Sequence, residues 1–212
     1  MTTKTDAPEK APYHHGDLKK ALLEAAEVEL IDKGVEAFSL RGVAKRAGVS
    51  HAAPAHHFKD TNTLLTALAT VAAERFHAAM TDRQAKAAAD PQSQFVASGL
   101  GYIDFALTNP ALFKLMFGSE RPATDDPELI HHSMSSFMVL VDGVAAIRGF
   151  NPFEQDEGRL DVTAAWSLVH GISNLLISGR MQFLQPLLEK DREGTLTRLV
   201  ERVIPGGLAR PD

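Results

Sequence analysis

The chain has 212 residues and no cysteine. Disulfide bonds and thiolate metal sites are therefore excluded, and the absence fits a reducing cytoplasm. Long apolar runs are also missing, since the richest stretch, 137–147, is interrupted by Asp142 and is shorter than the roughly 18–20 residues of a membrane helix. Residues 1–12 lack the apolar core of a signal peptide and predict a disordered arm. We therefore expect a cytoplasmic protein with no membrane partner.

An excess of positive charge is absent as well. The formal net charge is −5, from 22 Lys and Arg against 27 Asp and Glu. Residues 1–60 contain nine residues of each sign and sum to zero, so the remainder carries 13 basic and 18 acidic residues. Five of the nine histidines lie within residues 1–60. Global charge thus gives no support for nucleic-acid binding, and only local placement of basic groups can supply it.

Runs of alternating β-branched residues and internal repeats are lacking too, so the sequence predicts an all-α fold of about nine helices. The first helix is expected from Asp17 to Lys33, a second follows Ser39, and a third, capped by Ser50, ends near Phe58. Later helices are expected at about 61–88, 91–108, 127–148, 157–178 and 191–204, with a short one after Pro110. We expect four parts: 1–12, 13–65, 66–204 and a frayed tail at 205–212.

Residues 39–59 have the spacing of a helix-turn-helix. Ala44 is small enough for a helix crossing, and Gly48 permits the positive backbone angle that the turn needs. This leaves several side chains for the outside: Arg41, Lys45, His51, Ala52, His56 and Lys59. An ordinary helical hairpin has the same spacing, so the pattern by itself does not decide between the two.

The wider context resembles a known family. The segments YHHGDLKKALLEAA and GVEAFSLRGVAKRAGVSHAAPAHHFKDTNTLL resemble the DNA-binding domain of TetR-family regulators over about residues 13–66. Residues 109–117, NPALFKLMF, and 166–171, WSLVHG, resemble the WHG group of TetR-like C-terminal domains. The resemblance implies a three-helix helix-turn-helix domain followed by a helical domain for ligand binding and dimerisation.

Roles for individual residues follow from this resemblance. Positions near the second helix and along the recognition helix are implied to contact phosphates or base edges. The implied DNA-binding residues are Ser39, Arg41, Ser50, His51, Ala52, Ala53, His56, His57, Lys59 and Thr61. The segment around His14 and His15 could touch the DNA backbone.

Within this DNA-binding region, the chain departs from its relatives at three positions. Ala55 and Thr61 stand where many relatives have Tyr and Lys, which removes two phosphate contacts, and Pro54 lies inside a short helix. We therefore expect few ionic contacts with DNA and a shallow salt dependence.

The histidines offer no metal site or catalytic set. Three His-His pairs occur, at 14–15, 56–57 and 131–132, but adjacent helical residues do not share a face. No HExxH motif accompanies them, so we expect neither a metal nor a cofactor. An enzyme that uses His170 remains an alternative, although no nucleophile, base and orienting group can be identified together.

Apolar helices of the C-terminal half predict a ligand pocket. The segment 127–148 is apolar on most sides, and His170 and Asn174 place polar groups one turn apart on another apolar helix. The predicted lining residues are Tyr102, Met116, Phe117, Met134, Phe137, Met138, Trp166, His170 and Asn174. A plain hydrophobic core is the alternative interpretation of the same residues.

The last helices also carry apolar stripes that could form a two-fold interface. The predicted dimer residues are Leu168, Ile172, Leu175, Leu196, Leu199, Val200 and Val203. Together these patterns predict a homodimeric repressor, released from a pseudo-palindromic operator by a small, mostly apolar effector. A DNA-binding protein without an effector, and activation in place of repression, remain open at this point.

Overall fold

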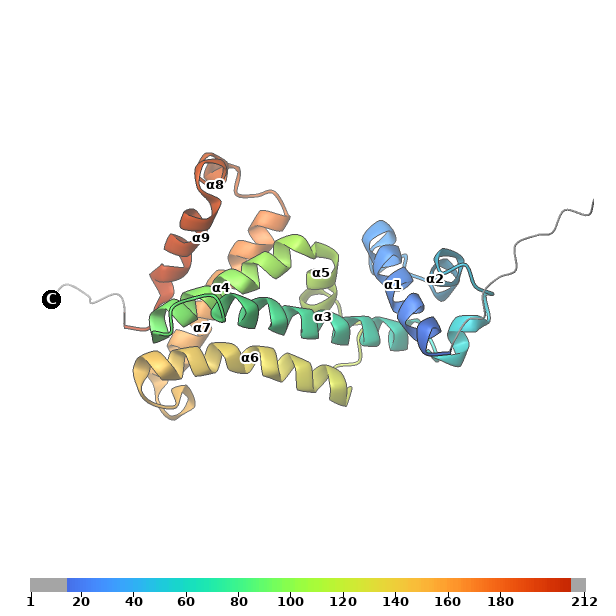
Figure 1. The fold of residues 1–212 in the computed structure, drawn as a ribbon, viewed down its shortest axis with the longest axis horizontal. Helices are drawn as coiled ribbons and strands as arrows, with labels where there is room; N and C mark the ends of the chain where they lie inside the picture. The colour runs from blue at the N-terminus through green and yellow to red at the C-terminus, as the bar shows by residue number, and fades with distance from the viewer. Residues whose placement is uncertain (1–14, 207–212) are drawn as a thin grey trace, which may run out of the picture. The chain divides into compact units, whose positions relative to one another are not determined.

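The computed structural model describes residues 15–206, with side chains from residue 18 onward. The expected arm at 1–12, the segment around His14 and most of the expected tail lie outside the described residues. Within the described range there are nine α-helices, four short 3₁₀ helices and no strand, which confirms the all-α prediction (Figure 1).

The chain divides into two compact units, residues 1–64 and 65–212. The first unit contains α1 (His15–Lys33), α2 (Leu40–Arg46) and the 3₁₀ helix η1 (Ala53–His56). Helix α3 (Thr61–Gln84) begins in the first unit and continues into the second. The remaining helices belong to the second unit: α4 (Pro91–Thr108), α5 (Pro110–Gly118), α6 (Pro127–Arg148), η2 (Pro152–Glu154), α7 (Asp156–Ile177), η3 (Gln182–Leu184), α8 (Gln185–Lys190), α9 (Arg192–Val200) and η4 (Glu201–Val203).

The first helix ends and the second begins where the sequence predicted, although α1 begins at His15, two residues before the expected start at Asp17. Helix α1 ends at Lys33, and Ser39 caps α2 by accepting a hydrogen bond from the Gly42 amide at 3.1 Å. A small core holds the unit together, because apolar residues at helical spacing on α1 meet Val43 of α2 and Phe58 after η1. Its fully or nearly fully buried members are Leu22, Ala26, Leu30, Phe38, Val43, Ala44 and Phe58.

The third helix is shorter than predicted. It is a four-residue 3₁₀ helix that begins after Ala52, and no side chain caps it, so the expected cap at Ser50 was wrong. Pro54 explains the change, because it has no amide proton and its ring would meet the carbonyl of residue 50 in an α-helix. Tighter i to i+3 bonds form around it, from the Ala53 amide to Ser50 and from the His57 amide to Pro54.

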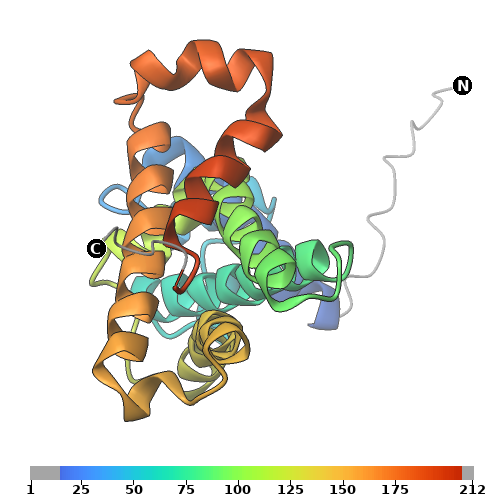
Figure 2. The same ribbon diagram turned by 90° about the vertical axis from the view of Figure 1, so that its left-hand side faces the viewer.

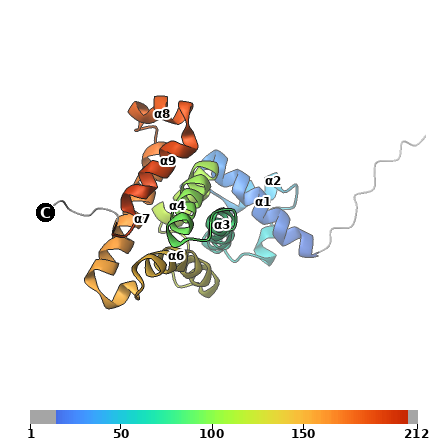
Figure 3. The ribbon, with the colours of Figure 1, turned by 60° about the vertical axis from the view of Figure 1, so that its left-hand side comes forward.

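In the second unit α4 is the central helix. It packs against α5, α6, α7 and α9, and Figure 3 shows these helices and α3 arranged around it. Nine of its residues are buried, including Phe95, Ile103 and Phe105. Helices α8 and α9 pack on each other, and α9 returns to α4 and α7 (Figure 2). The short helix α8 was missed by the sequence pattern, because none of its residues is buried.

Two helices of this unit, α6 and α7, would be long and apolar enough to cross a membrane. The search for uninterrupted apolar runs in the sequence did not find these two helices. Polar and charged residues, such as Asp142 of α6, interrupt both of them. A packed helix of a helical domain has the same length and composition, and α6 and α7 pack against α4 and against each other. Their apolar character is therefore weak evidence for a membrane.

Candidate functional site

The turn between α2 and η1 has helix-turn-helix geometry. Gly48 has a φ of 68°, in the left-handed region, and the Val49 amide donates to the Ala44 carbonyl at 3.0 Å to close the turn. Ala44 is fully buried where α2 packs on α1. The two residues that the sequence singled out for the crossing and the turn therefore have those structural roles.

The predicted DNA-binding residues lie along the outside of the first unit. Arg41, at the start of α2, is exposed, as are Ser50 and His51 in the turn. Three more follow on or near η1 with exposed side chains, namely Ala52, His56 and Lys59. The other four are half-buried: Ser39, Ala53, His57 and Thr61. All ten are thus open to solvent at least in part, and none belongs to the buried core.

One basic residue near this surface, Arg46, forms ion pairs within the unit. Arg46, in the last turn of α2, forms ion pairs with Glu29 and Asp32 of α1. Glu29 is buried, so the guanidinium compensates a carboxylate that would otherwise lack a partner. Hydrogen bonds from Lys33 and Arg46 hold the pKa of Asp32 below its ordinary value. Arg46 therefore fixes α2 on α1, and the other exposed cations of residues 39–61 are Arg41, Lys45 and Lys59.

The start of α3 is capped by an acidic side chain. Asp60 Oδ1 accepts from the Thr63 amide at 2.8 Å and from the Thr63 hydroxyl at 2.9 Å. These bonds keep the pKa of Asp60 below its ordinary value, so the cap stays ionised at neutral pH. Asp60 directly precedes Thr61, the first residue of α3, so this helix begins where the sequence predicted.

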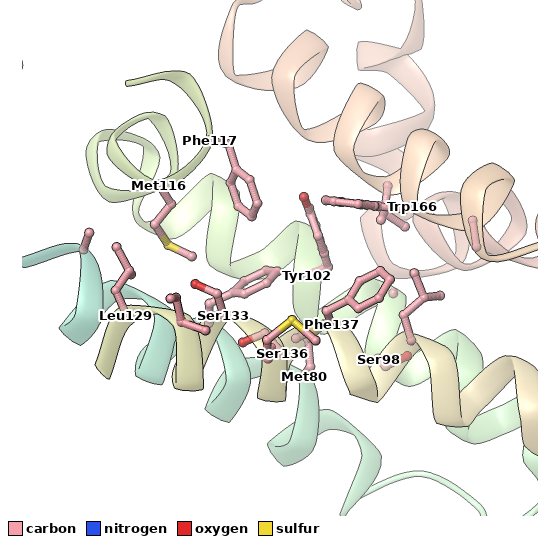
Figure 4. Close-up of a pocket in the computed structure, with 18 of the residues that line it drawn as sticks. Met80, Ser98, Tyr102, Met116, Phe117, Leu129, Ser133, Ser136, Phe137 and Trp166 are labelled. Carbon is pink, nitrogen blue, oxygen red and sulfur yellow. The ribbon is translucent and has the colours of Figure 1, made fainter. Parts of the chain in front are cut away.

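The second unit contains a cavity of about 540 Å³. Its walls come from α3, α4, α5, α6 and α7, from the loop before α6 and from the end of α9. Figure 4 shows Tyr102, Phe117, Phe137 and Trp166 around the same space. This volume lies within the roughly 300–1,000 Å³ of typical small-molecule sites.

Six of the nine predicted ligand residues line this cavity: Tyr102, Met116, Phe117, Met134, Phe137 and Trp166. Met138, His170 and Asn174 are not among its lining residues. The sequence missed lining residues on α3, α4 and α6 and in the loop before α6, including Phe76, Met80, Phe95, Ser98, Pro122, Leu129 and Ser136. Apolar periodicity gives the buried face of a helix but does not distinguish a core face from a cavity wall.

His170 nevertheless contacts the wall through Tyr102. Tyr102 Oη and His170 Nδ1 are 2.8 Å apart. Burial raises the pKa of the Tyr102 hydroxyl above its ordinary value, and a hydrogen bond with Trp166 opposes this shift in part. Burial also lowers the pKa of His170, so both groups are neutral at neutral pH. Asn174 is exposed and donates to the His170 carbonyl, so the chain itself provides partners for both polar residues.

The predicted dimer residues fall into two groups. Ile172, Leu196 and Val200 are buried within their own subunit, where they pack α7 and α9 into the unit. Leu175 is 42% exposed, and three others are half-buried, namely Leu168, Leu199 and Val203. Nearby on η3 and α8, Phe183 and Leu187 are also exposed. An apolar surface thus lies on α7 and α8, with part of the predicted stripe turned inward.

No cluster of three or more His, Cys, Asp or Glu side chains suited to a metal ion occurs among the described residues. The geometry in this part of the chain is that of two sites on separate units. One is an exposed helix-turn-helix with helix N-termini and a few cations. The other is a ligand-sized cavity with aromatic walls. A helix-turn-helix joined to a helical domain of this kind defines the class of DNA-binding regulators.

Comparison with known proteins identifies the family. Residues 22–68 match the family described as bacterial regulatory proteins of the tetR family, and residues 95–203 match a tetracyclin repressor-like C-terminal domain. Among solved structures, a protein of unknown function from Rhodococcus sp. RHA1 is 30% identical, with a TM-score of 0.75 over 95% of this chain and 100% of that chain. A search of curated proteins found no match.

More distant structures share the fold. The TetR family transcriptional regulator PfmR from Thermus thermophilus is 21% identical, with a TM-score of 0.64 over 89% of this chain and 99% of that chain. The fatty acid degradation regulator FadR from Bacillus halodurans is 16% identical, with a TM-score of 0.61 over 89% of this chain and 98% of that chain. The C-terminal family match alone covers more than half of the chain. The chain belongs to the TetR family of DNA-binding transcriptional regulators, whose members bind operator DNA and typically dimerise.

Proposed function

We propose that the protein is a cytoplasmic, homodimeric repressor that leaves a pseudo-palindromic operator when a small, mostly apolar molecule enters the cavity of the second unit. The observation that carries this proposal is the combination of an exposed helix-turn-helix with an aromatic cavity in one chain. A regulator without an effector needs no cavity of this size, and an enzyme needs a nucleophile and a base that the cavity walls do not present.

DNA recognition in this proposal uses the ten residues predicted from the sequence. The amides at the start of α2 and the cations Arg41 and Lys59 bind phosphates. Ser50 and His51 reach base edges in the major groove, and the methyl groups of Ala52 and Ala53 contact thymine methyl groups. Two copies related by a two-fold axis would read two half-sites, with Leu175 and its apolar neighbours on α7 and α8 at the interface.

The route from the cavity to the first unit runs through α3 in this proposal. Helix α3 contributes Ala69, Phe76 and Met80 to the cavity wall, and its first residues belong to the first unit. The loop between α5 and α6 contributes Ser119, Pro122 and Thr124 to the same wall.

A hydrogen bond ties this loop to α3. The amide of Ala123 donates to the Thr66 hydroxyl at 2.9 Å, and Thr66 is buried one turn after the start of α3. A molecule that displaces the loop would therefore act on α3 close to the point where the helix enters the first unit.

Selection from a random pool of double-stranded DNA tests the central claim. The purified protein should enrich a sequence with two inverted half-sites, and its affinity for this sequence should fall when an apolar effector is added. Failure to enrich an inverted repeat at low salt would contradict operator binding. Enrichment without any response to apolar molecules would leave a DNA-binding protein whose second unit only dimerises.

A further inference from the structure

The chemistry of the cavity wall narrows the class of effector. We propose that the cavity binds an uncharged, largely apolar molecule whose polar group is a hydrogen-bond donor, such as an alcohol or a phenol, and that it selects against carboxylates, phosphates and cations. This inference rests on the proposed function of the cavity as the effector site.

The first observation is that the wall carries no charge. None of the 24 lining residues is Asp, Glu, Lys, Arg or His. Most are aromatic or aliphatic, and the polar ones bear hydroxyl groups: Ser98, Tyr102, Ser119, Thr124, Ser133 and Ser136. A charged ligand group buried here would lose its hydration without gaining an ionic partner. His170, behind Tyr102, does not supply a charge either, because burial lowers its pKa.

The second observation concerns the protons of the buried hydroxyl groups. The Ser98 hydroxyl donates to the Phe95 carbonyl at 2.8 Å, and the Ser136 hydroxyl donates to the His132 carbonyl at 3.0 Å. Both serines are buried, at 6% and 5% exposure, and a hydroxyl has one proton to donate. Toward the cavity, these two hydroxyl groups can therefore only accept hydrogen bonds.

Tyr102 also has a partner within the chain. Its Oη atom lies 2.8 Å from His170 Nδ1. The buried serine hydroxyls on α4 and α6 therefore present lone pairs to the cavity, and a ligand satisfies them best with an O–H or N–H group.

The single tryptophan of the chain provides a direct measurement, because Trp166 lines the cavity. We would titrate the full-length protein with decan-1-ol, decan-2-one, decanoate and decylammonium at pH 7.5, below their aggregation limits, and follow Trp166 fluorescence. The alcohol and the two ions do not absorb in the tryptophan range, and a parallel titration of free tryptophan corrects for the weak absorption and quenching by the ketone. We expect decan-1-ol to bind with saturation, and the two ions to bind at least about tenfold more weakly, because neither finds a counter-charge.

Comparison of the ketone with the alcohol tests whether the ligand must donate a hydrogen bond. Decan-2-one can only accept, so it should bind about fivefold more weakly than decan-1-ol, the value of one hydrogen bond. Ser136→Ala should reduce this preference while leaving the affinity for the ketone unchanged. Ser135→Ala is the matched control, because its hydroxyl makes the same bond to the residue four before it but does not line the cavity.

The outcomes separate the two claims. Equal or tighter binding of decanoate or decylammonium would overturn the uncharged class, and equal binding of the ketone would overturn the donor requirement; both results would leave the cavity as an effector site. Weaker binding of both alcohol and ketone to Ser136→Ala would indicate a disturbed fold, and Ser98→Ala then tests the same preference from α4. No fluorescence change with any probe, in a protein that still selects an operator, would overturn the effector site and this inference with it.

Discussion

The residues around His170 determine the protonation state of its side chain. Its Nδ1 atom faces the Tyr102 hydroxyl, and its ring packs against Phe113 and Phe117 at centroid distances of 5.4 and 5.2 Å. A charged imidazolium would lose its hydration in these surroundings. The lowered pKa of His170 is thus a consequence of the aromatic cluster around it.

The lowered pKa of His170 predicts a pH dependence of stability. Its stabilising contribution is complete above the unfolded pKa of 6.5 and is lost as the pH falls through the lower folded value. We expect the melting temperature to fall by a few degrees between pH 7.5 and pH 5.5, and His170→Gln to narrow this difference. Thermal denaturation at the two pH values measures it. An equal difference in the variant would assign the effect to other histidines.

Gly101 lies where α4 crosses α3 without space for a side chain. A Cβ atom added there would lie 2.4 Å from the Ala79 carbonyl oxygen and 2.6 Å from the Met80 Cα, both backbone atoms of α3. We expect Gly101→Ala to destabilise the protein by about 1–3 kcal/mol, because two helix backbones must separate. Denaturant unfolding measures this. Gly118→Ala, with no atom within 4 Å of its Cβ, is the control and should be nearly neutral.

At the scale of elements, α3 is the helix that the two units share. Its exposed start follows the Asp60 cap, and its later turns form cavity wall and core. Ser136 of α6 also bonds the Ala73 carbonyl, and His132 pairs with Glu74, so one turn of α6 contacts α3 at these neighbouring residues. A change on α6 or in the loop before it therefore acts on α3 at several points.

The bond between the Ala123 amide and Thr66 predicts a variant with altered coupling. Thr66→Val removes the acceptor, and we expect it to keep operator affinity but to reduce the effect of decan-1-ol on this affinity about fivefold, the value of one hydrogen bond. Fluorescence anisotropy of labelled operator measures both quantities. Thr70→Val is the control, since this buried hydroxyl bonds only one turn back, to the Thr66 carbonyl. Equal coupling in Thr66→Val and in the unaltered protein would refute this route.

At the scale of the whole molecule, the proposed dimer would bury an apolar surface that the single chain leaves exposed. Leu175, Phe183 and Leu187 are 42%, 78% and 47% exposed on α7, η3 and α8. We expect Leu175→Glu to shift the protein from dimer to monomer at micromolar concentration, because a buried carboxylate at the interface would lack a partner. Light scattering after size exclusion measures the mass. Ile31→Glu, at an apolar position of α1 that is 66% exposed, should remain dimeric.

The lack of net positive charge on residues 1–60 predicts a shallow salt dependence of DNA binding. With Arg46 held by Glu29 and Asp32, the proposed phosphate contacts from cations are Arg41 and Lys59, or four in a dimer. The slope of log affinity against log salt should then be about −4 or shallower at pH 8. Titrations of the selected operator from low to moderate salt measure the slope. A slope near −8 would show that further cations contact the DNA.

The sequence by itself determined the elements whose limits are local. Ser39, Gly48 and Asp60 act within a few residues of themselves, so the cap of α2, the turn and the start of α3 were predictable. The all-α class follows from apolar periodicity for the same reason. The length of η1 was not predicted correctly, although its cause, Pro54, is also local.

Only the tertiary structure decided which apolar helix faces line the cavity and which pack into the hydrophobic core. Ser98, Ser136 and Phe76 become cavity wall because α3, α4 and α6 meet there, whereas Ile172, Leu196 and Val200 turn into the subunit. The tertiary structure also determines that Arg46 pairs with Glu29, 17 residues earlier in the chain. In the same way, Tyr102 is hydrogen-bonded with His170, 68 residues later. Such pairings depend on how helices distant in sequence pack, and helical periodicity gives the face of a residue but not its partner.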